Sequence, residues 1–305
     1  MMTTAHTTIT QRPGRSFNWG RAFVWLLMIL LILVTLFPLY WVARTALTES
    51  RMVFTDPTAL WPPGFTLFNF RRVLGLVSTQ EAVQAGGTGQ TLNFFLFLRN
   101  SVIVATVITV GQVFFSATAA YAFARLRFPF RNPLFFIYIS ALMIPGIVTL
   151  IPNFILIRNL GWLNTFAGII APYFLMTPFA VFFLRQFFLG INREVEEAAK
   201  IDGASVFGIF WRIVLPISQP PLMTLGIITF ITAWNEYLWP LVVGRDESVR
   251  VLTVALGVFR SQTPQGAPDW AGLMAGTTLA VIPTVLLFIF LGRRVLDSIQ
   301  FTGFK

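Results

Sequence analysis

The sequence predicts an all-α, polytopic membrane protein with six transmembrane helices. Hydrophobic residues make up 56% of the 305 residues and charged residues only 11%, and the mean hydropathy is +0.74. A soluble domain of this length would carry roughly a quarter charged residues. Apolar runs of about 20 residues, which is the length that crosses a hydrocarbon core, recur along the chain. These observations favour repeated membrane crossing over a soluble core.

Six apolar runs define the predicted helices. They lie at residues 22–43, 101–123, 133–156, 166–188, 217–243 and 271–292. The first run follows three arginines, as a signal peptide does, but it is too long and lacks a small-residue cleavage site, so we expect a retained anchor. Pro145 and Pro152 in the third run free backbone carbonyls, which indicates a kink, although packing explains them equally well. The predicted organisation is a tail of residues 1–21, a transmembrane domain of residues 22–292 and a tail of residues 293–305.

Arginine and lysine residues predict the orientation, because short cytoplasmic loops carry an excess of them. With both termini in the cytoplasm, the cytoplasmic segments contain Arg12, Arg15, Arg21, Arg125, Arg127, Arg131, Arg193, Lys200, Arg212, Arg293, Arg294 and Lys305. The long connection of residues 45–100 also holds arginines, but long loops follow the charge rule poorly. We therefore expect both termini in the cytoplasm, and we interpret Arg125 as an anchor at the inner head groups.

Composition excludes several classes of protein. The chain has no cysteine and one histidine, His6, which lies in the polar N-terminal tail. The chain therefore lacks the residues that would form disulfides, thiolate metal sites, cysteine nucleophiles or histidine-based triads. We expect no catalytic residue, metal or cofactor. The net charge is +10, but the basic residues are scattered between apolar runs, without the dense stripe that nucleic-acid binding needs. We expect them to set topology and to contact anionic lipid head groups of the bilayer.

The sequence also lacks a P-loop, which needs Gly-Lys-Ser or Gly-Lys-Thr after a glycine-rich turn. Lys200 and Lys305 are the only lysines, and they follow Ala199 and Phe304. If ATP drives this protein, another subunit must hydrolyse it. We therefore do not expect this chain to be an enzyme.

Residues 190–220 form a polar stretch with turn signals between long apolar runs. Asn192 is a suitable helix N-cap, and the acidic residues that follow favour the positive end of the helix dipole. Asp202 and Gly203 form a turn signal. A second helical period follows at Phe207, Phe210, Trp211 and Val214. The stretch therefore predicts two short helices that meet at an angle, with one apolar and one acidic face.

This stretch resembles the EAA loop of permease subunits in binding-protein-dependent ABC importers. The family pattern is E-A-A-x-x-D-G-A followed by F-x-x-I-x-L-P-x-x-x-P. It is matched by Glu197, Ala198, Ala199, Asp202, Gly203, Ala204, Phe210, Ile213, Leu215, Pro216 and Pro220. The resemblance implies a type I ABC importer permease fold in the cytoplasmic membrane of a bacterium or archaeon.

The resemblance also implies the partners and the coupling residues. The partners would be a homologous second permease, two copies of an ATP-binding subunit and an extracytoplasmic solute-binding protein. The coupling residues would be Glu197, Ala198, Asp202, Gly203, Phe210 and Pro216. In this scheme Glu197 pairs with an arginine of the ATPase, and Phe210 anchors the second helix. The C-terminal tail departs from maltose-type permeases because it keeps only Gly303 and Lys305 of their glycine-rich finish, so its insertion between ATPase subunits is in doubt.

A second constellation lies in the fifth run, where Trp234, Asn235, Glu236 and Tyr237 precede Leu-Trp-Pro-Leu. Polar residues inside an apolar helix are costly and should face a cavity or a partner. The block resembles the W-N-E-[FY]-x-W-P-L segment of the carbohydrate-importer branch. This implies that these four residues line a path for a sugar or a glycerol-phosphate-like solute. The alternative is an aromatic belt near the outer interface, where the helix ends.

Two other assignments remain open. An ion-gradient-driven secondary transporter should show intramembrane carboxylates paired between two halves, but Glu236 stands nearly alone. An intramembrane enzyme lacks the residues for a catalytic centre. The loop of residues 244–270 is either a contact for the solute-binding protein or a solvated loop.

Overall fold

A computed structural model describes residues 19–87, 92–260 and 268–300 of the chain. In the first part of the chain the helices are α1 (Trp19–Ala46), η1 (Ser50–Met52), α2 (Phe68–Val73), α3 (Thr79–Gln84), α4 (Phe94–Arg125), α5 (Arg131–Ser140), η2 (Ala141–Met143), α6 (Gly146–Asn159), α7 (Phe166–Phe174) and α8 (Pro178–Gly190). They are followed by α9 (Arg193–Ile201), α10 (Val206–Ile209), η3 (Phe210–Val214), α11 (Leu215–Ile217), α12 (Gln219–Asn235), α13 (Leu238–Val243), α14 (Leu252–Ala255), η4 (Leu256–Arg260) and α15 (Trp270–Gln300). The described residues contain no β-strand, which confirms the all-α prediction.

Three of the predicted spans are single continuous helices. They are α1, α4 and the part of α15 at Trp270–Gly292, and each is long and apolar enough to cross a bilayer. Helix α4 begins before the apolar run because Asn93 caps it, accepting a hydrogen bond from the Leu96 N–H at 3.4 Å. The first, second and sixth predicted runs therefore correspond to these three helices.

The other three runs are not single straight helices, and the third is bent where its prolines indicated a kink. The third run is divided into α5–η2 and α6, with a bend of 98°. Pro145 explains the break because it has no N–H and holds Ile144 in an extended conformation, whereas Pro152 lies within α6. The fourth run is divided into α7 and α8, bent by 42° just before Pro178. The chain thus has up to six spans when each bent pair is counted as one.

The fifth run also ends differently from the prediction. Helix α12 stops at Asn235, and Glu236 is extended, with φ −63° and ψ 127°. The last residues of the run form the separate helix α13. At its other end, α12 meets the preceding helical segment, residues 206–217, at 77°. The predicted span of residues 217–243 is therefore one long helix followed by a short one.

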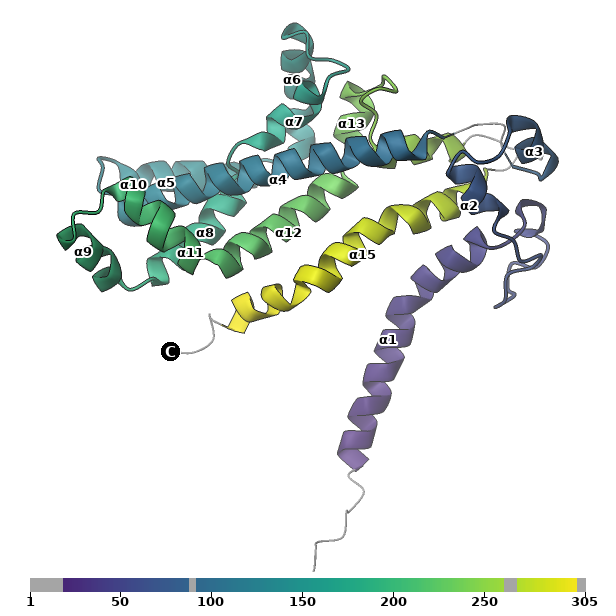
Figure 1. Ribbon diagram of the computed structural model, residues 1–305, viewed down its shortest axis with the longest axis horizontal. Helices are drawn as coiled ribbons and strands as arrows, with labels where there is room; N and C mark the ends of the chain where they lie inside the picture. Colours follow the sequence, from purple (N-terminus) through teal and green to yellow (C-terminus); the bar gives the residue numbers. More distant parts are fainter. Residues whose placement is uncertain (1–18, 88–91, 261–267, 301–305) are drawn as a thin grey trace, which may run out of the picture.

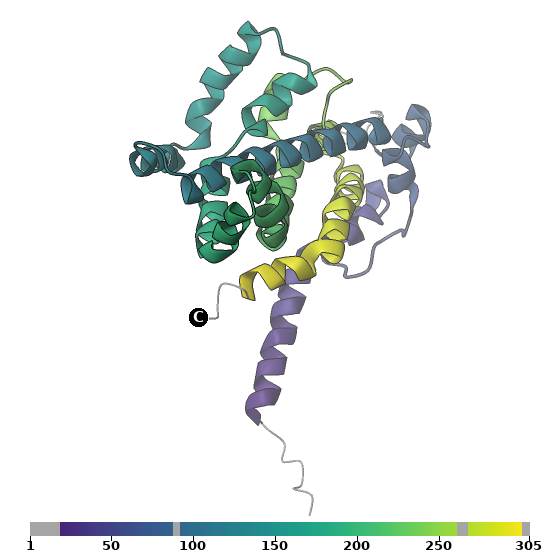
Figure 2. The same cartoon turned by 60° about the vertical axis from the view of Figure 1, so that its left-hand side comes forward.

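Helix α4 runs the length of the molecule and packs against α7, α8 and α12, while α15 packs against α1, α2 and α12 (Figure 1). Buried side chains form one cluster at the α9 end and another around α2 and the start of α15. Helix α1 projects from this bundle, and most of its large apolar side chains are exposed (Figure 2). The bundle thus holds α9–α11 at one end of α4 and the loops around α2 at the other.

Candidate functional site

Helix α9 forms where the sequence predicts it. Asn192 caps it by accepting a hydrogen bond from the Glu194 N–H at 3.1 Å, and Glu194 and Glu196 occupy the first turn. The helix ends at the predicted turn, where Gly203 has φ +82°. A Cβ added to Gly203 would meet no atom within 4 Å, so the turn requires glycine for its left-handed backbone and not for space.

The second helical segment is less regular than predicted. Ser205 caps α10 by accepting a hydrogen bond from the Gly208 N–H at 3.1 Å. The π-helix η3 follows, and Pro216 then cannot donate the next backbone hydrogen bond. Of the predicted apolar face, Phe210 is buried, while Phe207 and Trp211 remain exposed. We use "coupling loop" for residues 190–220, which comprise α9, α10, η3 and α11.

A buried ion pair ties the coupling loop to α4. Arg125 Nε lies 2.9 Å from Glu196 Oε1, and the two side chains are 5% and 6% exposed. The guanidinium also donates hydrogen bonds to the carbonyl oxygens of Phe188, at 2.6 Å, and of Ile191. Arg125 therefore connects α4, the end of α8 and α9. Its interpretation as a head-group anchor was wrong, because the folded chain supplies its partners.

The sequence analysis gave Glu196 no separate role. The sequence feature that could have identified Glu196 is its position three residues before Ala199, because residues at this spacing share one face of a helix. Ala199 packs against the buried cluster, so a carboxylate on the same face requires a buried partner.

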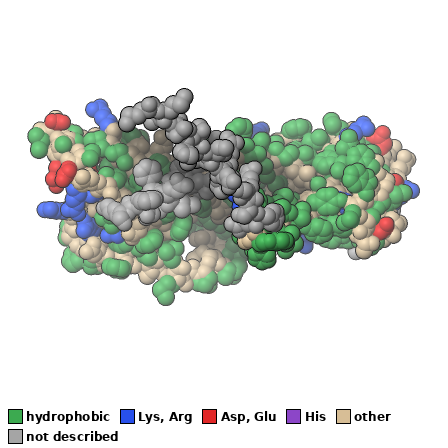
Figure 3. Space-filling model, turned by 90° about the horizontal axis from the view of Figure 1, so that it is seen from below, with side chains coloured by type: hydrophobic (Ala, Val, Ile, Leu, Met, Phe, Trp, Pro, Cys, Tyr) green, Lys and Arg blue, Asp and Glu red, His purple; other side chains and the backbone are tan. Residues whose placement is uncertain are grey.

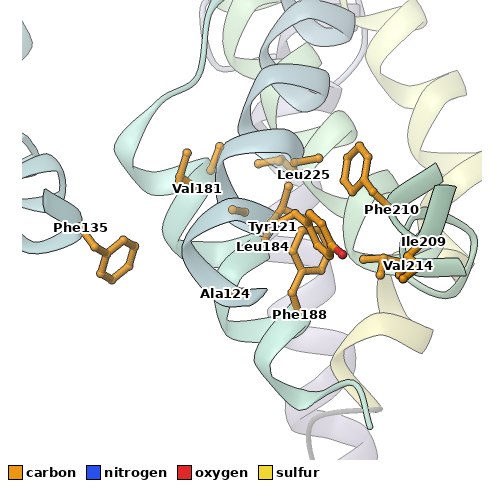
Figure 4. Close-up of a cluster of buried hydrophobic side chains, with 13 residues drawn as sticks. Tyr121, Ala124, Phe135, Val181, Leu184, Phe188, Ile209, Phe210, Val214 and Leu225 are labelled. Carbon is orange, nitrogen blue, oxygen red and sulfur yellow. The ribbon is translucent and has the colours of Figure 1, made fainter. Parts of the chain in front are cut away.

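Phe210 inserts into the buried cluster at this end of the bundle (Figure 4). Its ring centroid lies 5.1 Å from that of Tyr121 on α4, and Tyr121 lies 6.5 Å from Phe188 on α8. Val214 and Ile209 are fully buried in the same cluster. The apolar side of the coupling loop is therefore fixed to the same two helices as the ion pair.

The remaining predicted coupling residues lie on the opposite, exposed side of the loop. Glu197, Ala198, Asp202, Gly203 and Pro216 are all exposed. The structure therefore divides the predicted set into one buried residue, Phe210, and five that are accessible to a partner. This exposed side presents the carboxylates of Glu197 and Asp202 together with the cations Arg193 and Lys200.

A cavity of about 180 Å³ lies between α4, α7 and α12, and Glu236 is the only residue of the predicted solute path among its lining residues. The lining residues are Val104, Ile108, Gln112, Ile169, Tyr173, Phe179, Leu225, Ile228, Thr229, Thr232, Ala233, Glu236, Trp239 and Pro240. The Glu236 carboxylate accepts a hydrogen bond from the Trp239 N–H at 3.2 Å, which places it at the start of α13. No Lys or Arg is among these described lining residues.

The other three predicted path residues lie outside the cavity lining. Trp234 is buried and stacks on Phe230, and its Nε1 donates a hydrogen bond to the Ala280 carbonyl at 3.1 Å. These contacts place Trp234 in the core and not in the cavity lining. Asn235 is exposed, and its amide donates to the Ile231 carbonyl at 2.8 Å. Tyr237 is exposed at the break between α12 and α13.

The sequence analysis missed several polar residues of the cavity, among them Gln112, Thr229 and Thr232. Gln112 on α4 donates hydrogen bonds to the hydroxyl of Thr177, at 3.0 Å, and to that of Thr229, at 3.5 Å. Their signal is polarity within apolar helices, the same signal that identified Glu236. Gln112, Thr229 and Glu236 give the cavity an amide, a hydroxyl and a carboxylate.

We expect Trp234→Ala to destabilise the fold rather than to alter a solute contact. Removing a buried, hydrogen-bonded tryptophan costs about 3–5 kcal/mol, whereas the exposed Asn235 should tolerate alanine with less than about 0.5 kcal/mol. Thermal unfolding of the purified variants in detergent measures this difference. Equal stability of the Trp234→Ala and Asn235→Ala variants would contradict the core assignment.

The loop after α13 is held against the ends of α4 and α6. The Asn164 side chain accepts hydrogen bonds from the N–H groups of Arg245, at 2.9 Å, and Asp246, at 3.1 Å. Asn100 donates to the carbonyl oxygens of Ser248 and Arg250. Hydrogen bonds from Ser248 lower the pKa of Asp246. The loop thus presents charged side chains on a fixed backbone.

Two findings concern the composition and the tails. The described part of the chain holds no group of three or more His, Cys, Asp or Glu residues that could bind a metal ion. His6, Gly303 and Lys305 lie outside the described residues.

Comparison of the sequence with protein-family models finds a match over more than half of the chain. Residues 112–300 match the family described as "Binding-protein-dependent transport system inner membrane component". The chain is 33% identical over 295 residues to the probable ABC transporter permease protein YurM of Bacillus subtilis (strain 168). That alignment covers 96% of this chain and 92% of the relative. It is 37% identical over 269 residues to the sn-glycerol-3-phosphate transport system permease protein UgpE of Salmonella typhi. That alignment covers 88% of this chain and 91% of the relative.

Solved structures show the same fold. The chain resembles a subunit of a bacterial ABC transporter involved in the import of the acidic polysaccharide alginate. The TM-score is 0.75 at 22% identity, over 93% of this chain and 99% of that chain. A second match, with a TM-score of 0.56 at 12% identity, covers 90% of this chain and 96% of a chain in the alginate transporter bound to its periplasmic protein.

Proposed function

The chain belongs to the family of binding-protein-dependent transport system inner membrane components, and from that premise we propose that it forms half of the membrane path of an ABC sugar importer. The family is a multi-pass membrane permease of importers, and α1, α4, α15 and the three bent helix pairs are the spans that suit this role. The observation that carries the proposal is the coupling loop, which is fixed to the bundle on one side and exposed on the other.

We propose that a separate ATPase docks on the exposed side of the coupling loop. Glu197 and Asp202 are exposed carboxylates, and each can pair with an arginine of the ATPase. Arg125, Glu196 and Phe210 connect that surface to α4 and α8. Movement of the docked ATPase would therefore be transmitted to the helices that line the cavity.

The proposed assembly contains a second permease, two ATPase copies and an extracytoplasmic solute-binding protein. The exposed apolar faces of α1 and α6 suit contact with lipid or with the second permease. The basic residues favour both termini in the cytoplasm, with the coupling loop on the same side. The loop of residues 244–250, at the opposite end of α4 from the coupling loop, is then the surface proposed for the solute-binding protein.

We propose an uncharged, hydroxyl-rich solute for this half of the path. Gln112, Thr229 and Glu236 supply the donors and acceptors that bind hydroxyl groups, and Tyr173 and Trp239 supply aromatic surface. The related UgpE proteins are named for sn-glycerol-3-phosphate, and the structural neighbour imports an acidic polysaccharide. A cavity with a carboxylate and without a cation among its described lining residues favours a neutral sugar over either anion.

Glu236→Gln tests this solute path. The glutamine oxygen can still accept the Trp239 N–H, so the start of α13 is retained while the charge is lost. We expect uptake to fall about ten- to a hundredfold, which corresponds to the roughly 1.5–3 kcal/mol of a hydrogen bond to a charged group. Glu81→Gln, an exposed variant in α3 whose capping box also accepts glutamine, should transport as the wild type does. Wild-type uptake by the Glu236→Gln variant would remove Glu236 from the path.

Uptake of radiolabelled maltose, glucose and sn-glycerol 3-phosphate, in cells with and without this chain, tests the function itself. The proposal predicts sugar uptake that requires this chain and stops when ATP is depleted. Uptake that survives ATP depletion and collapses with an uncoupler would instead indicate an ion-gradient-driven carrier.

A further inference from the structure

An open groove of about 790 Å³ lies beside α9, between that helix and the connection from α4 to α5. We call it the basic groove. It is lined by Arg125, Leu126, Arg127, Phe128, Phe130, Arg131, Asn132, Pro133, Arg193, Glu196, Glu197 and Lys200. The proposed docking of the ATPase uses Glu197 at its edge but leaves the cations of the groove without a role.

The basic groove carries an excess of positive charge. Arg125 and Glu196 neutralise each other, which leaves Arg127, Arg131, Arg193 and Lys200 against the single carboxylate of Glu197. In Figure 3, Lys and Arg side chains gather at the left-hand end of the molecule, which is the end that holds α5 and α9 in Figure 1. Gathering like charges in one groove is unfavourable, so the groove favours an anionic ligand.

Three of the four cations are accessible to such a ligand. Arg127, Arg193 and Lys200 are exposed. Arg131 is partly buried, and its Nη1 donates a hydrogen bond to the Leu126 carbonyl at 3.0 Å, which fixes its guanidinium. Arginine can bind a phosphate through two parallel hydrogen bonds, and lysine adds a point charge.

The groove includes the first residues of α5, a helix that carries exposed apolar side chains. Helix α5 begins at Arg131, and Leu134, Phe136 and Ile137 on it are exposed. Phe130, at the junction, is 76% exposed. Phosphate-binding chemistry therefore lies directly beside a surface suited to acyl chains. A soluble anion or an acidic protein surface would use only the first of these features.

We propose that the basic groove binds the head group of an anionic phospholipid, with the phosphate on Arg127, Arg131, Arg193 and Lys200 and an acyl chain along α5. The inference depends on the cytoplasmic placement of the coupling loop, where the leaflet is rich in anionic lipid and basic pockets between helices bind such head groups. The bound lipid contacts both α5 and α9. It therefore fixes the height of the coupling loop relative to the bilayer.

The test is lipid retention by the purified importer. The complex is reconstituted into nanodiscs of equal parts phosphatidylglycerol and phosphatidylcholine and re-extracted in detergent, and the retained lipid is measured by mass spectrometry. We expect the wild type to retain phosphatidylglycerol selectively. Arg127→Gln/Arg193→Gln/Lys200→Gln should retain about a hundredfold less, since each of the three basic residues near an anionic surface contributes roughly a factor of five. Arg71→Gln/Arg158→Gln/Arg245→Gln removes equal charge from exposed sites outside the groove and should retain as much as the wild type.

Equal phosphatidylglycerol retention by the two triple variants would overturn the proposal. A second measurement, ATPase recovery in nanodiscs of phosphatidylcholine alone, separates lipid from protein contact. Unchanged ATPase recovery by the groove variant there supports the lipid site. Loss of the ATPase there, with phosphatidylglycerol retention intact, would show that the groove contacts the ATPase instead. Because the lipid is measured without transport, failure of this proposal leaves the proposed importer function standing.

Discussion

Glu196→Ala is expected to destabilise the protein by about 3–5 kcal/mol and to release the ATPase, although Glu196 lies on the buried side of the coupling loop. Removing one member of a buried ion pair leaves an uncompensated buried charge. Here that charge is the Arg125 guanidinium, whose side chain is 5% exposed. Thermal unfolding in detergent and co-purification of the ATPase measure the two effects.

The neighbouring carboxylate gives a matched control. Glu197→Ala removes an exposed acid one position along α9, so the change in stability should stay within about 0.5 kcal/mol. Arg125→Met/Glu196→Leu removes both charges and should cost less than the sum of the single variants, because the pair is coupled. The buried ion pair would be contradicted if the stability losses of the single variants at positions 125 and 196 added up to the loss of the double variant. Equal stability of Glu196→Ala and Glu197→Ala would contradict it as well.

Gly203→Asp is expected to reduce ATPase recovery at least tenfold while the protein still inserts into the membrane. Gly203 has φ +82°, where a side chain costs about 1–2 kcal/mol. The new carboxylate also lies on the exposed turn next to Asp202. It changes the shape and charge of the docking surface, and this lowers the affinity of a partner that matches the original surface. Recovery of the ATPase per mole of permease, after affinity purification from membranes, gives the magnitude.

Gly161→Asp is the matched control, because Gly161 has φ +71° and, like Gly203, has no atom within 4 Å of an added Cβ. It lies between α6 and α7, away from the coupling loop. Equal ATPase loss by both variants would indicate general misfolding. Gly203→Asn separates the two contributions, because asparagine tolerates the left-handed conformation and carries no charge.

The long apolar helices and the cap and turn of α9 could be predicted from the sequence because their causes are local. A run of apolar residues, the Asn192 cap and the Asp202–Gly203 turn each act within a few positions. Breaks within the spans are harder to predict. Pro145 divides a span while Pro152 does not, although both lack the same N–H. Which proline breaks the helix depends on packing around it, and packing cannot be derived from spacing alone.

The same limit applies to the candidate site. Residues 125 and 196 are far apart in the sequence, so their pairing depends on how α4, α8 and α9 assemble. Trp234 and Glu236 are two positions apart within one motif, yet one lies in the core and the other lines the cavity. The end of α12 at Asn235 produces that difference, since it turns Glu236 out of the helical register.

Site-specific photo-crosslinking tests the central claim, that the ATPase docks on the exposed side of the coupling loop, most directly. A photoreactive amino acid replaces Ala198, which is exposed on α9, or Leu60, which is exposed at the opposite end of α4. The account predicts an adduct between this 34.3 kDa chain and the ATPase from position 198 and none from position 60. An intact complex that gives no ATPase adduct at position 198 would contradict it.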